Sequence, residues 1–299
     1  MALPLRIAVA INPTASFGTT KDVGPAVVQA LAARGASVLR LQEANIELLR
    51  LSVRAAIAQG IDVLVVVGGD GMVSLAANAL AGTTIPLGIV PSGTGNDTAR
   101  GLGIPLGNTD AAITALWTAI ERGPRVIDVG IVRHGPHTTR FVGILSAGFD
   151  AIVNERANTW AWPRGKSRYT LALLRELLVL KPRRYTITTA GVTTVRDAVL
   201  IAVANNISFG GGMAAVPHAR LDDGILDLFV VAPLSRWRFL RLFPKVFSGT
   251  HTELDVVSFA TVKEITLDAE ALIAYADGER VGPLPVEVSV LPGALRVLA

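Results

Sequence analysis

The chain has 299 residues, of which 51% are apolar, and it carries a formal charge of +4 at neutral pH and no cysteine. The lack of cysteine excludes disulfides and thiolate metal sites and is typical of a reducing cytoplasm. No apolar run approaches the ~18–20 residues of a membrane-spanning helix. No block of five like charges and no zinc-finger or RNA-binding pattern occurs, so nothing favours a nucleic-acid partner.

The first 124 residues alternate strand-like and helix-like segments, which is typical of a parallel sheet with helices on both faces. The opening MALPLRIAVAINP has only a brief apolar core and no cleavage-site pattern, so we interpret it as the first strand and not as a signal peptide. The expected strands span 6–11, 37–41, 63–67 and 87–90, and the expected helices span 23–33, 46–58 and 73–80.

After Gly123-Pro124 the chain consists mainly of short β-rich segments separated by turn residues. This pattern predicts a mainly antiparallel β-sandwich domain at 125–299, following an α/β domain at 1–124. Strands are expected within 126–132, 140–145, 183–190, 198–205, 225–232, 262–269 and 286–291, with helical inserts around 168–180 and 235–247.

A glycine-rich turn, VVVGGDGM, ends the buried strand 63–67. Gly68, Gly69 and Gly71 allow a ligand to approach the backbone closely. The helix that follows directs its N–H groups and positive dipole end toward the same place, which favours phosphate. Asp70 is unexpected there, because a carboxylate repels phosphate unless a cation or a reacting proton lies between them.

A second such turn, PSGTGNDTARGLGIP, follows the next strand of the predicted sheet. Ser92, Thr94 and Asn96 place hydroxyl and amide groups among glycines, as in backbone nests that bind phosphate. The Walker pattern is absent, and a turn of this kind is by itself more often only a tight loop. Because ligands bind at the carboxyl ends of parallel strands, the two turns together favour a phosphate site.

Two acidic turns lie in the β-rich region, Asp222-Asp223-Gly224 and ADGE at 276–279. Asp-Gly is a strong hairpin signal, so from the residues alone each is more simply a solvated turn. Each also offers a carboxylate of the kind that a metal ion or a proton transfer requires.

Six stretches in chain order carry a family resemblance: NPTAS, VVGGDGM, PSGTGNDTARGLGIP, SAGFDA, LDDGILD and ADGE. They resemble the diacylglycerol kinase family of bacterial lipid kinases, which includes sphingosine and ceramide kinases and is more distantly similar to NAD kinases. The resemblance runs from residue 6 to about residue 290. It implies an ATP-binding kinase domain at 1–124 and a lipid-substrate domain at 125–299.

The reaction implied by this resemblance is the ATP- and Mg²⁺-dependent phosphorylation of diacylglycerol to phosphatidic acid. Another lipid alcohol, such as a sphingoid base, ceramide or a glycolipid, is the nearest alternative acceptor. NAD kinase is a weaker alternative, because Asp97 in the second turn is not expected there. A non-catalytic lipid- or nucleotide-binding regulator is the alternative from another class.

The resemblance also assigns residue roles. Glu279 is expected to be the general base, and Asp70 to reach Mg²⁺ directly or through water. A structural Mg²⁺ is expected at the carboxylate of Asp223 and the backbone carbonyls of Arg220 and Ile225. The residues expected to bind ATP are Asn12, Pro13, Thr14, Ala15, Ser16, Gly68, Gly69, Gly71, Met72, Ser92, Gly93, Thr94, Gly95, Asn96 and Asp97.

The sequence departs from the family pattern after the first glycine turn. The usual continuation is Gly-Asp-Gly-Thr followed by an Asn-Glu pair, whereas Met72, Ser74 and Leu75 occupy those places here. The contacts with ATP are therefore expected to differ in detail from those of the family. None of the proposed chemical carboxylates is missing, so we expect an active enzyme.

Two segments mix aromatic and basic residues as membrane interfaces do. They are 159–169, with Trp160 and Trp162, and 235–247, in which Pro244 shortens any helix. We expect a cytoplasmic protein that binds the anionic inner face of the membrane peripherally; amphipathic helices packed on the sandwich are an equal alternative. A homodimer is expected from the family alone.

Overall fold

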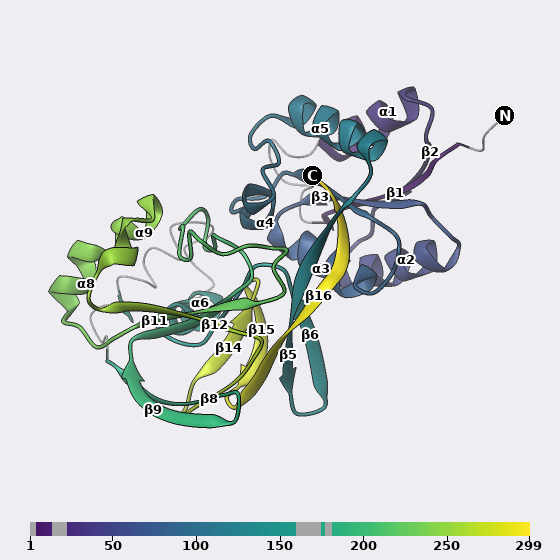
Figure 1. The fold of residues 1–299 in the computed structure, drawn as a ribbon. Coiled ribbons are helices and arrows are strands. Elements are labelled where there is room, and N and C mark those ends of the chain that lie inside the picture. The colour runs from purple at the N-terminus through teal and green to yellow at the C-terminus, as the bar shows by residue number, and fades with distance from the viewer. Residues whose placement is uncertain (1–3, 14–22, 160–174, 177–180) are drawn as a thin grey trace. The chain divides into compact units, whose positions relative to one another are not determined.

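The computed structural model describes residues 4–13, 23–159, 175–176 and 181–299. Contacts divide the chain into two units, Met1–Val129 with Pro292–Ala299, and Gly130–Leu291. Figure 1 shows the helices and strands of each unit. Much of the helical insert expected around 168–180, and both Trp160 and Trp162, lie outside the described residues.

A parallel sheet forms the centre of the first unit, in the order β2-β1-β3-β4. Strands β3 and β4 are buried along their whole length because helices cover both faces of the sheet, which is why they read as apolar runs. The strands are β1 (Arg6–Ile11), β2 (Ser37–Leu41), β3 (Val63–Gly68) and β4 (Leu87–Pro91).

Helices α1 (Val23–Ala33) and α5 (Thr109–Arg122) lie on one face of this sheet, and α2 (Ile46–Ala58) and α3 (Asp70–Leu80) on the other (Figure 1). Side-chain caps fix two helix starts: Asn45 accepts from Leu48 N and Asn108 from Ala111 N, each at 3.0 Å. A short helix, α4 (Asp97–Gly101), follows β4. The expected alternating fold is confirmed.

The second unit is the expected antiparallel sandwich. One sheet has the order β12-β11-β10-β7-β14-β15, and the other pairs β13 with β8 and with β16, and β8 with β9. The strands of the first are β12 (Val257–Val262), β11 (Leu226–Val231), β10 (Leu200–Ala204), β7 (Ile144–Ser146), β14 (Ile273–Ala276) and β15 (Glu279–Pro283). Those of the second are β13 (Glu264–Ala269), β8 (Arg183–Thr189), β9 (Val192–Ala198) and β16 (Val286–Leu298), with β5 (Arg125–His134) and β6 (His137–Phe141) pairing off its path.

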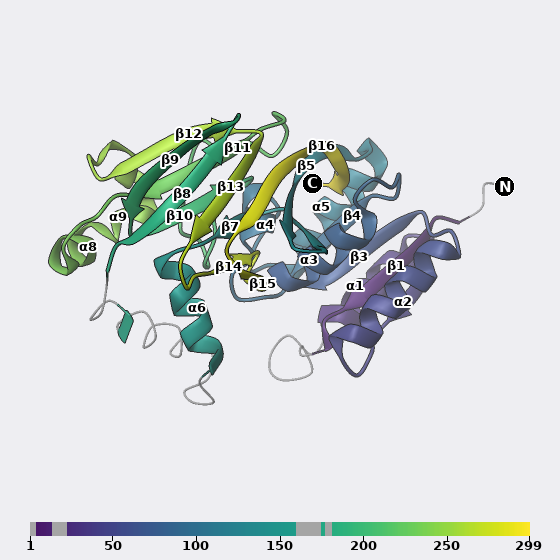
Figure 2. The same ribbon diagram turned by 90° about the horizontal axis from the view of Figure 1, so that it is seen from below.

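Figure 1 shows β11 and β12 in one layer and β8 and β9 in the other, and the two layers overlap in the view of Figure 2. The core between the layers contains Ile201 and Val203 of β10 together with Ile265 and Leu267 of β13. Burial alternates along β13, because only one face of its sheet meets this core. The helices with described bounds in this unit are α6 (Phe149–Thr159), α8 (Arg236–Leu242), α9 (Lys245–Ser248) and the 3₁₀ turn η2 (Thr250–Glu253).

Strand β16 contributes to both units. Val286 and Val288 pair with β13, whereas Val297 and Leu298 lie beside β4. The domain boundary expected after residue 124 was based on composition. Composition does not indicate that the last residues of the chain pair with a strand of the first unit. Within the part of the chain that the structure describes, no helix is long and apolar enough to cross a bilayer.

Candidate functional site

The two glycine turns predicted from the sequence touch each other at the ends of β3 and β4. Ser92 N donates to the carbonyl oxygen of Gly68 at 2.9 Å. The main chains of Gly69 and Gly93 approach so closely that a Cβ on Gly93 would lie 2.4 Å from Gly69 Cα. Glycine is required at this contact because no side-chain atom fits between the two backbones.

Asn96 shapes the second turn. It has a left-handed backbone (φ 53°), and its side chain bonds both backbone groups of Gly93, accepting from N at 3.0 Å and donating to O at 2.9 Å. Arg100 donates to Gly95 O at 3.2 Å and lies 3.9 Å from the buried carboxylate of Asp97. Both residues are predicted to bind ATP; the side chain of Asn96 bonds within the loop, and that of Asp97 is buried at the start of α4. Gly93 and Thr94 are exposed beside them.

Asp70 joins the two turns. It is the first residue of α3, and its Oδ1 accepts from the backbone N–H of Thr98 in α4 at 3.0 Å. The carboxylate is half-buried. Oxygen is the ligand type that Mg²⁺ prefers, so a carboxylate in this position fits the role expected of Asp70.

The residues that depart from the family pattern are buried. Met72 packs against Gly68, where a Cβ would lie 2.4 Å from Met72 Cγ. Ser74 and Leu75 are buried within α3, and Asn78 Nδ2 donates to Ser74 O at 2.9 Å. Met72 therefore packs α3 against the end of β3, and Ser74 and Leu75 lie on buried positions of the helix.

The first predicted ATP-contacting turn begins beside the same glycines. Asn12 N donates to Val67 O at 3.1 Å, and Asn12 Cβ would be 3.4 Å from a Cβ on Gly68. Pro13 follows it. Thr14, Ala15 and Ser16 lie outside the described residues.

Glu279 stands at the tip of a two-residue hairpin between β14 and β15. Asp277 (φ 50°) and Gly278 (φ 80°) both have the positive φ that such turns require, so the predicted hairpin is confirmed. Glu279 pairs with Ala276 and is exposed. An exposed carboxylate at a fixed turn is available to accept a proton.

Asp277 anchors this hairpin to a distant segment. Its Oδ2 accepts from Val142 N at 2.8 Å, and its Oδ1 accepts from Gly143 N at 2.8 Å and Ile144 N at 3.2 Å. The sequence predicted Asp277 only as a turn residue. Nothing in the sequence signals contacts across more than 130 positions, so this role was missed.

Replacing Asp277 with asparagine is expected to destabilise the second unit by about 2–3 kcal/mol. The amide oxygen retains part of the network, but the amide NH₂ opposes the N–H of Val142, because both are donors. Urea unfolding measures the loss, and Asp268→Asn, at an exposed position of β13, is the matched control. Equal stability of the two variants would contradict the anchoring role.

The acidic turn predicted to hold a structural metal ion is stabilised internally. Asp223 Oδ1 accepts from Ile225 N at 3.3 Å, and Arg220 Nε lies 3.5 Å from Asp222 Oδ1. Among the described residues, no three His, Cys, Asp or Glu side chains gather as a metal site. One carboxylate with backbone carbonyls is still an oxygen donor set, which suits a hard cation that keeps several waters.

A buried carboxylate, Asp227, follows this turn on β11. His218 Nε2 lies 3.4 Å from its Oδ1. Burial raises the pKa of Asp227 above its usual value, opposed by His218 and assisted by the nearby charge of Asp223. The folded state therefore holds this proton more tightly than the unfolded chain, so the contribution of Asp227 to stability falls as pH rises through the raised pKa.

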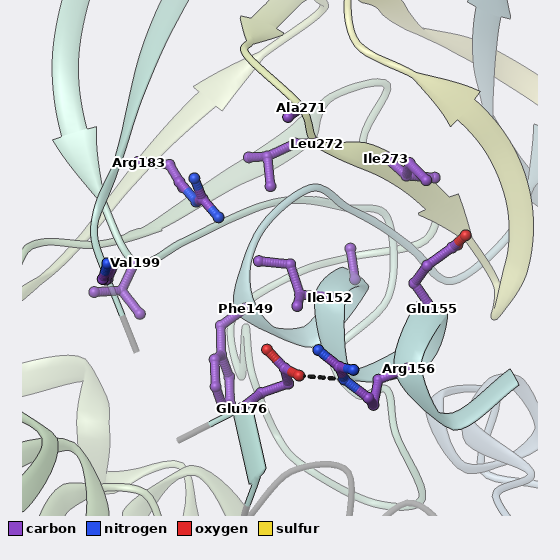
Figure 3. Close-up of a pocket in the computed structure, with 12 residues that line it drawn as sticks. Phe149, Ile152, Glu155, Arg156, Glu176, Arg183, Val199, Ala271, Leu272 and Ile273 are labelled. Atoms are coloured by element: carbon purple, nitrogen blue, oxygen red, sulfur yellow. Dashed lines mark hydrogen bonds and ion pairs between the residues drawn. The ribbon is translucent and has the colours of Figure 1, made fainter. Parts of the chain in front are cut away.

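A pocket of about 540 Å³ lies within the second unit (Figure 3). Its lining includes an ion pair between Arg156 Nε and the buried Glu176 Oε1 at 2.5 Å. The charged lining residues are Glu155, Arg156, Glu176, Lys181 and Arg183, and the large apolar ones are Phe149, Ile152, Val199, Leu272 and Ile273. The volume is in the range of small-molecule sites, and its mixed lining suits an amphiphile.

Solved structures share this fold. A diacylglycerol kinase from Bacillus anthracis superposes with a TM-score of 0.71 at 23% identity, covering 98% of this chain and 96% of that one. An NAD kinase from Archaeoglobus fulgidus, solved in complex with ATP, superposes with a TM-score of 0.56 at 14% identity, covering 98% and 93%. The fold is thus that of a class of kinases which combine an α/β domain with a β-sandwich.

Sequence comparisons identify the family within this class. Residues 6–132 match the diacylglycerol kinase catalytic domain, and residues 143–299 match the YegS C-terminal NAD kinase beta sandwich-like domain. A diacylglycerol kinase from Mycobacterium tuberculosis is 39% identical over 96% of this chain and 93% of its own length. The chain belongs to the diacylglycerol kinase family of lipid kinases, and it is a phosphotransferase.

Proposed function

We propose that the protein transfers the γ-phosphoryl group of ATP to the hydroxyl of diacylglycerol, giving ADP and phosphatidic acid. The observation that carries the proposal is the contact between the glycine turns of β3 and β4, with Asp70 between them. The name of the Mycobacterium tuberculosis relative supports diacylglycerol as the acceptor.

The glycine turns bind the phosphates of ATP in this proposal. Gly71 in the first turn of α3 is exposed, as are Gly93 and Thr94 in the second glycine turn, so backbone N–H groups and the helix dipole favour an anion there. A bound Mg²⁺ would neutralise phosphate charge. Asp70 supplies a carboxylate oxygen for it, and the turn of Asp223 with the carbonyls of Arg220 and Ile225 supplies a second, structural set.

Glu279 is the general base of the proposed reaction. Its carboxylate takes the proton of the lipid hydroxyl as that oxygen attacks the γ-phosphorus, and the bond to the β-phosphate bridging oxygen breaks. A positioned base contributes about 10²–10⁴ to the rate. The anchor formed by Asp277 keeps the hairpin that carries Glu279 in place.

The pocket of the second unit supports an acceptor with hydrocarbon chains. Phe149, Ile152, Leu272 and Ile273 line it with apolar surface, and burial of each CH₂ group there contributes about 0.8 kcal/mol. The charged side chains of the lining suit the polar end of a lipid. A fully hydrophilic acceptor would leave the apolar wall without a partner.

Phosphate transfer from labelled ATP into lipids in mixed micelles tests the proposal. We expect label in diacylglycerol with Mg²⁺, loss of label with a chelator, and none in NAD. Preferential label in sphingosine, ceramide or a glycolipid would show that this lipid, and not diacylglycerol, is the acceptor. Label in NAD alone, or ATP binding without any transfer, would overturn the proposal.

The proposed membrane-docking surface is formed by α8 and α9. Trp237 is 82% exposed, Leu240 44% and Phe247 53%, and Phe239 alone of α8 is buried. Arg238 is paired with Asp255. The other basic residues of the surface, all exposed, are Arg236, Arg241 and Lys245. Exposed aromatic and basic side chains on short helices suit an anionic lipid surface.

The double variant Trp237→Ala, Phe247→Ala is expected to bind anionic phosphatidylglycerol vesicles roughly tenfold more weakly than the wild type, because apolar burial in the interface is lost. Vesicle sedimentation measures this binding. Leu51→Ala, which removes a side chain that is 60% exposed on α2, is the control and should bind unchanged. Equal binding by all three proteins would contradict the docking surface.

A further inference from the structure

One carboxylate on α6 contacts both strands of the hairpin that carries Glu279. Glu155 Oε2 accepts from the hydroxyl of Tyr275 on β14 at 2.5 Å, and it lies 3.4 Å from Nε of Arg280 on β15. None of these three residues belongs to the six stretches that carry the family resemblance. Together they form a bridge from a helix to the two strands.

The strand pairing places this bridge next to the proposed base. Tyr275 pairs with Arg280, and the adjacent pair toward the turn is Ala276 with Glu279. The register shifts between Ala274 and Tyr275, so the ladder is irregular just where Glu155 holds it. Such irregularities re-aim side chains and are frequent beside active sites.

Glu155 is also part of the pocket wall. Figure 3 shows Glu155 projecting from α6 toward the strand that carries Ile273, with Ile152 on the same helix. The strand β14 therefore begins at the pocket with Ile273 and ends at the turn before Glu279. A displacement of α6 against β14 would move the carboxylate of Glu279.

The bridge positions the hairpin and contributes little to the free energy of unfolding. The side chains of Arg280 and Glu155 are 52% and 38% exposed, and an exposed pair of this kind is worth about 0–1 kcal/mol. Tyr275 is only 1% exposed, so water does not compete for the hydrogen bond between its hydroxyl and Glu155. This bond therefore fixes the orientation of the two side chains. Such packing locks a functional side chain into its productive position.

We propose that Glu155 is a positioning residue that sets the place of Glu279 through Tyr275 and Arg280. This inference rests on the proposed function for its consequence in turnover, because it concerns the base of that reaction. The structural part of the proposal, that Glu155 holds the hairpin in place, depends only on the contacts of Glu155 with Tyr275 and Arg280.

Two tyrosines provide a matched test. Tyr275 and Tyr185 are both fully buried in the second unit, but the hydroxyl of Tyr185 donates to Ala147 O at 2.8 Å, whereas that of Tyr275 donates to Glu155. Tyr275→Phe is expected to lower kcat roughly tenfold or more, since small misplacements of a reacting group are costly, while KM for ATP stays unchanged. Tyr185→Phe should show a similar loss in Tm and an unchanged kcat.

Variants of the carboxylate complete the experiment. Glu155→Ala should reproduce the kcat loss of Tyr275→Phe, and the double variant should be no worse than the stronger single one, because both remove the same bridge. Glu155→Gln, whose amide oxygen still accepts from the tyrosine hydroxyl, should lie between Glu155→Ala and the wild type. Additive losses would overturn the proposal.

Hydrogen exchange tests the positioning role of Glu155 separately from the proposed lipid kinase function. Backbone amides of 277–281 should exchange faster in Tyr275→Phe than in Tyr185→Phe. A wild-type protein that phosphorylates no lipid would refute the proposed function, yet this difference in exchange would still support the positioning role. Equal exchange in the two variants, or equal kcat in an active enzyme, would overturn the positioning role.

Discussion

Replacing Glu279 with glutamine is expected to lower kcat by roughly 10²–10⁴, because the amide cannot accept the proton of the acceptor hydroxyl. The substitution keeps the size of the side chain, and Glu279 is exposed at the hairpin tip, so stability should stay within about 0.5 kcal/mol of the wild type. Steady-state transfer of labelled phosphate measures kcat, and calorimetric titration measures ATP affinity, which should not change.

Glu287→Gln is the matched control for this experiment. Glu287 is an exposed glutamate on β16 in the same unit, and nothing in the proposed chemistry involves it. A Glu279→Gln enzyme as active as the Glu287→Gln enzyme would show that Glu279 is not the base. A parallel loss of ATP affinity would instead show that Glu279 acts in nucleotide binding.

The substitution Gly93→Ala is expected to abolish measurable ATP binding and to destabilise the first unit by about 3 kcal/mol. Its Cβ would lie 2.4 Å from Gly69 Cα and 2.9 Å from Gly69 N, which are backbone atoms of β3's turn and cannot rotate away. The two turns would have to separate, and the phosphate-binding backbone would separate with them. Titration calorimetry and urea unfolding measure the two losses.

Gly103→Ala is the control that distinguishes a steric clash from the backbone strain of placing alanine at a glycine position. Gly103 has a positive φ of 74°, with nothing within 4 Å of its Cβ position, so the substitution costs only the backbone strain of about 1–2 kcal/mol. Its ATP affinity should equal that of the wild type. If Gly93→Ala also retained ATP affinity, the contact of the glycine turns would not be the phosphate site.

Regular elements of the first unit were predictable because their causes are local. The strand 6–11 and the helices 23–33 and 46–58 have the predicted bounds, since apolar periodicity and nearby glycines define their ends. The helix expected at 73–80 begins earlier, at Asp70, because its first turn contains no apolar stripe. Its start depends on the glycine turn and on contacts with α4.

The geometry of the site was predictable only in part. Adjacent glycine turns follow from adjacent parallel strands, so their proximity can be inferred from chain order. The contacts of Asp277 and Glu155 join residues more than 100 positions apart and use side chains that also occur in ordinary turns and helices. Only the folded chain brings them together, and no periodic pattern records them.

The path of β16 affects how the protein is made. Val297 and Leu298 lie beside β4, more than 200 residues later in the chain, and Leu298 belongs to the core of the first unit. During synthesis the ribosome must therefore deliver the whole sandwich before the α/β unit receives its last strand. Until then the edge of β4 in the nascent α/β unit stays unpaired, and an unpaired strand edge favours aggregation.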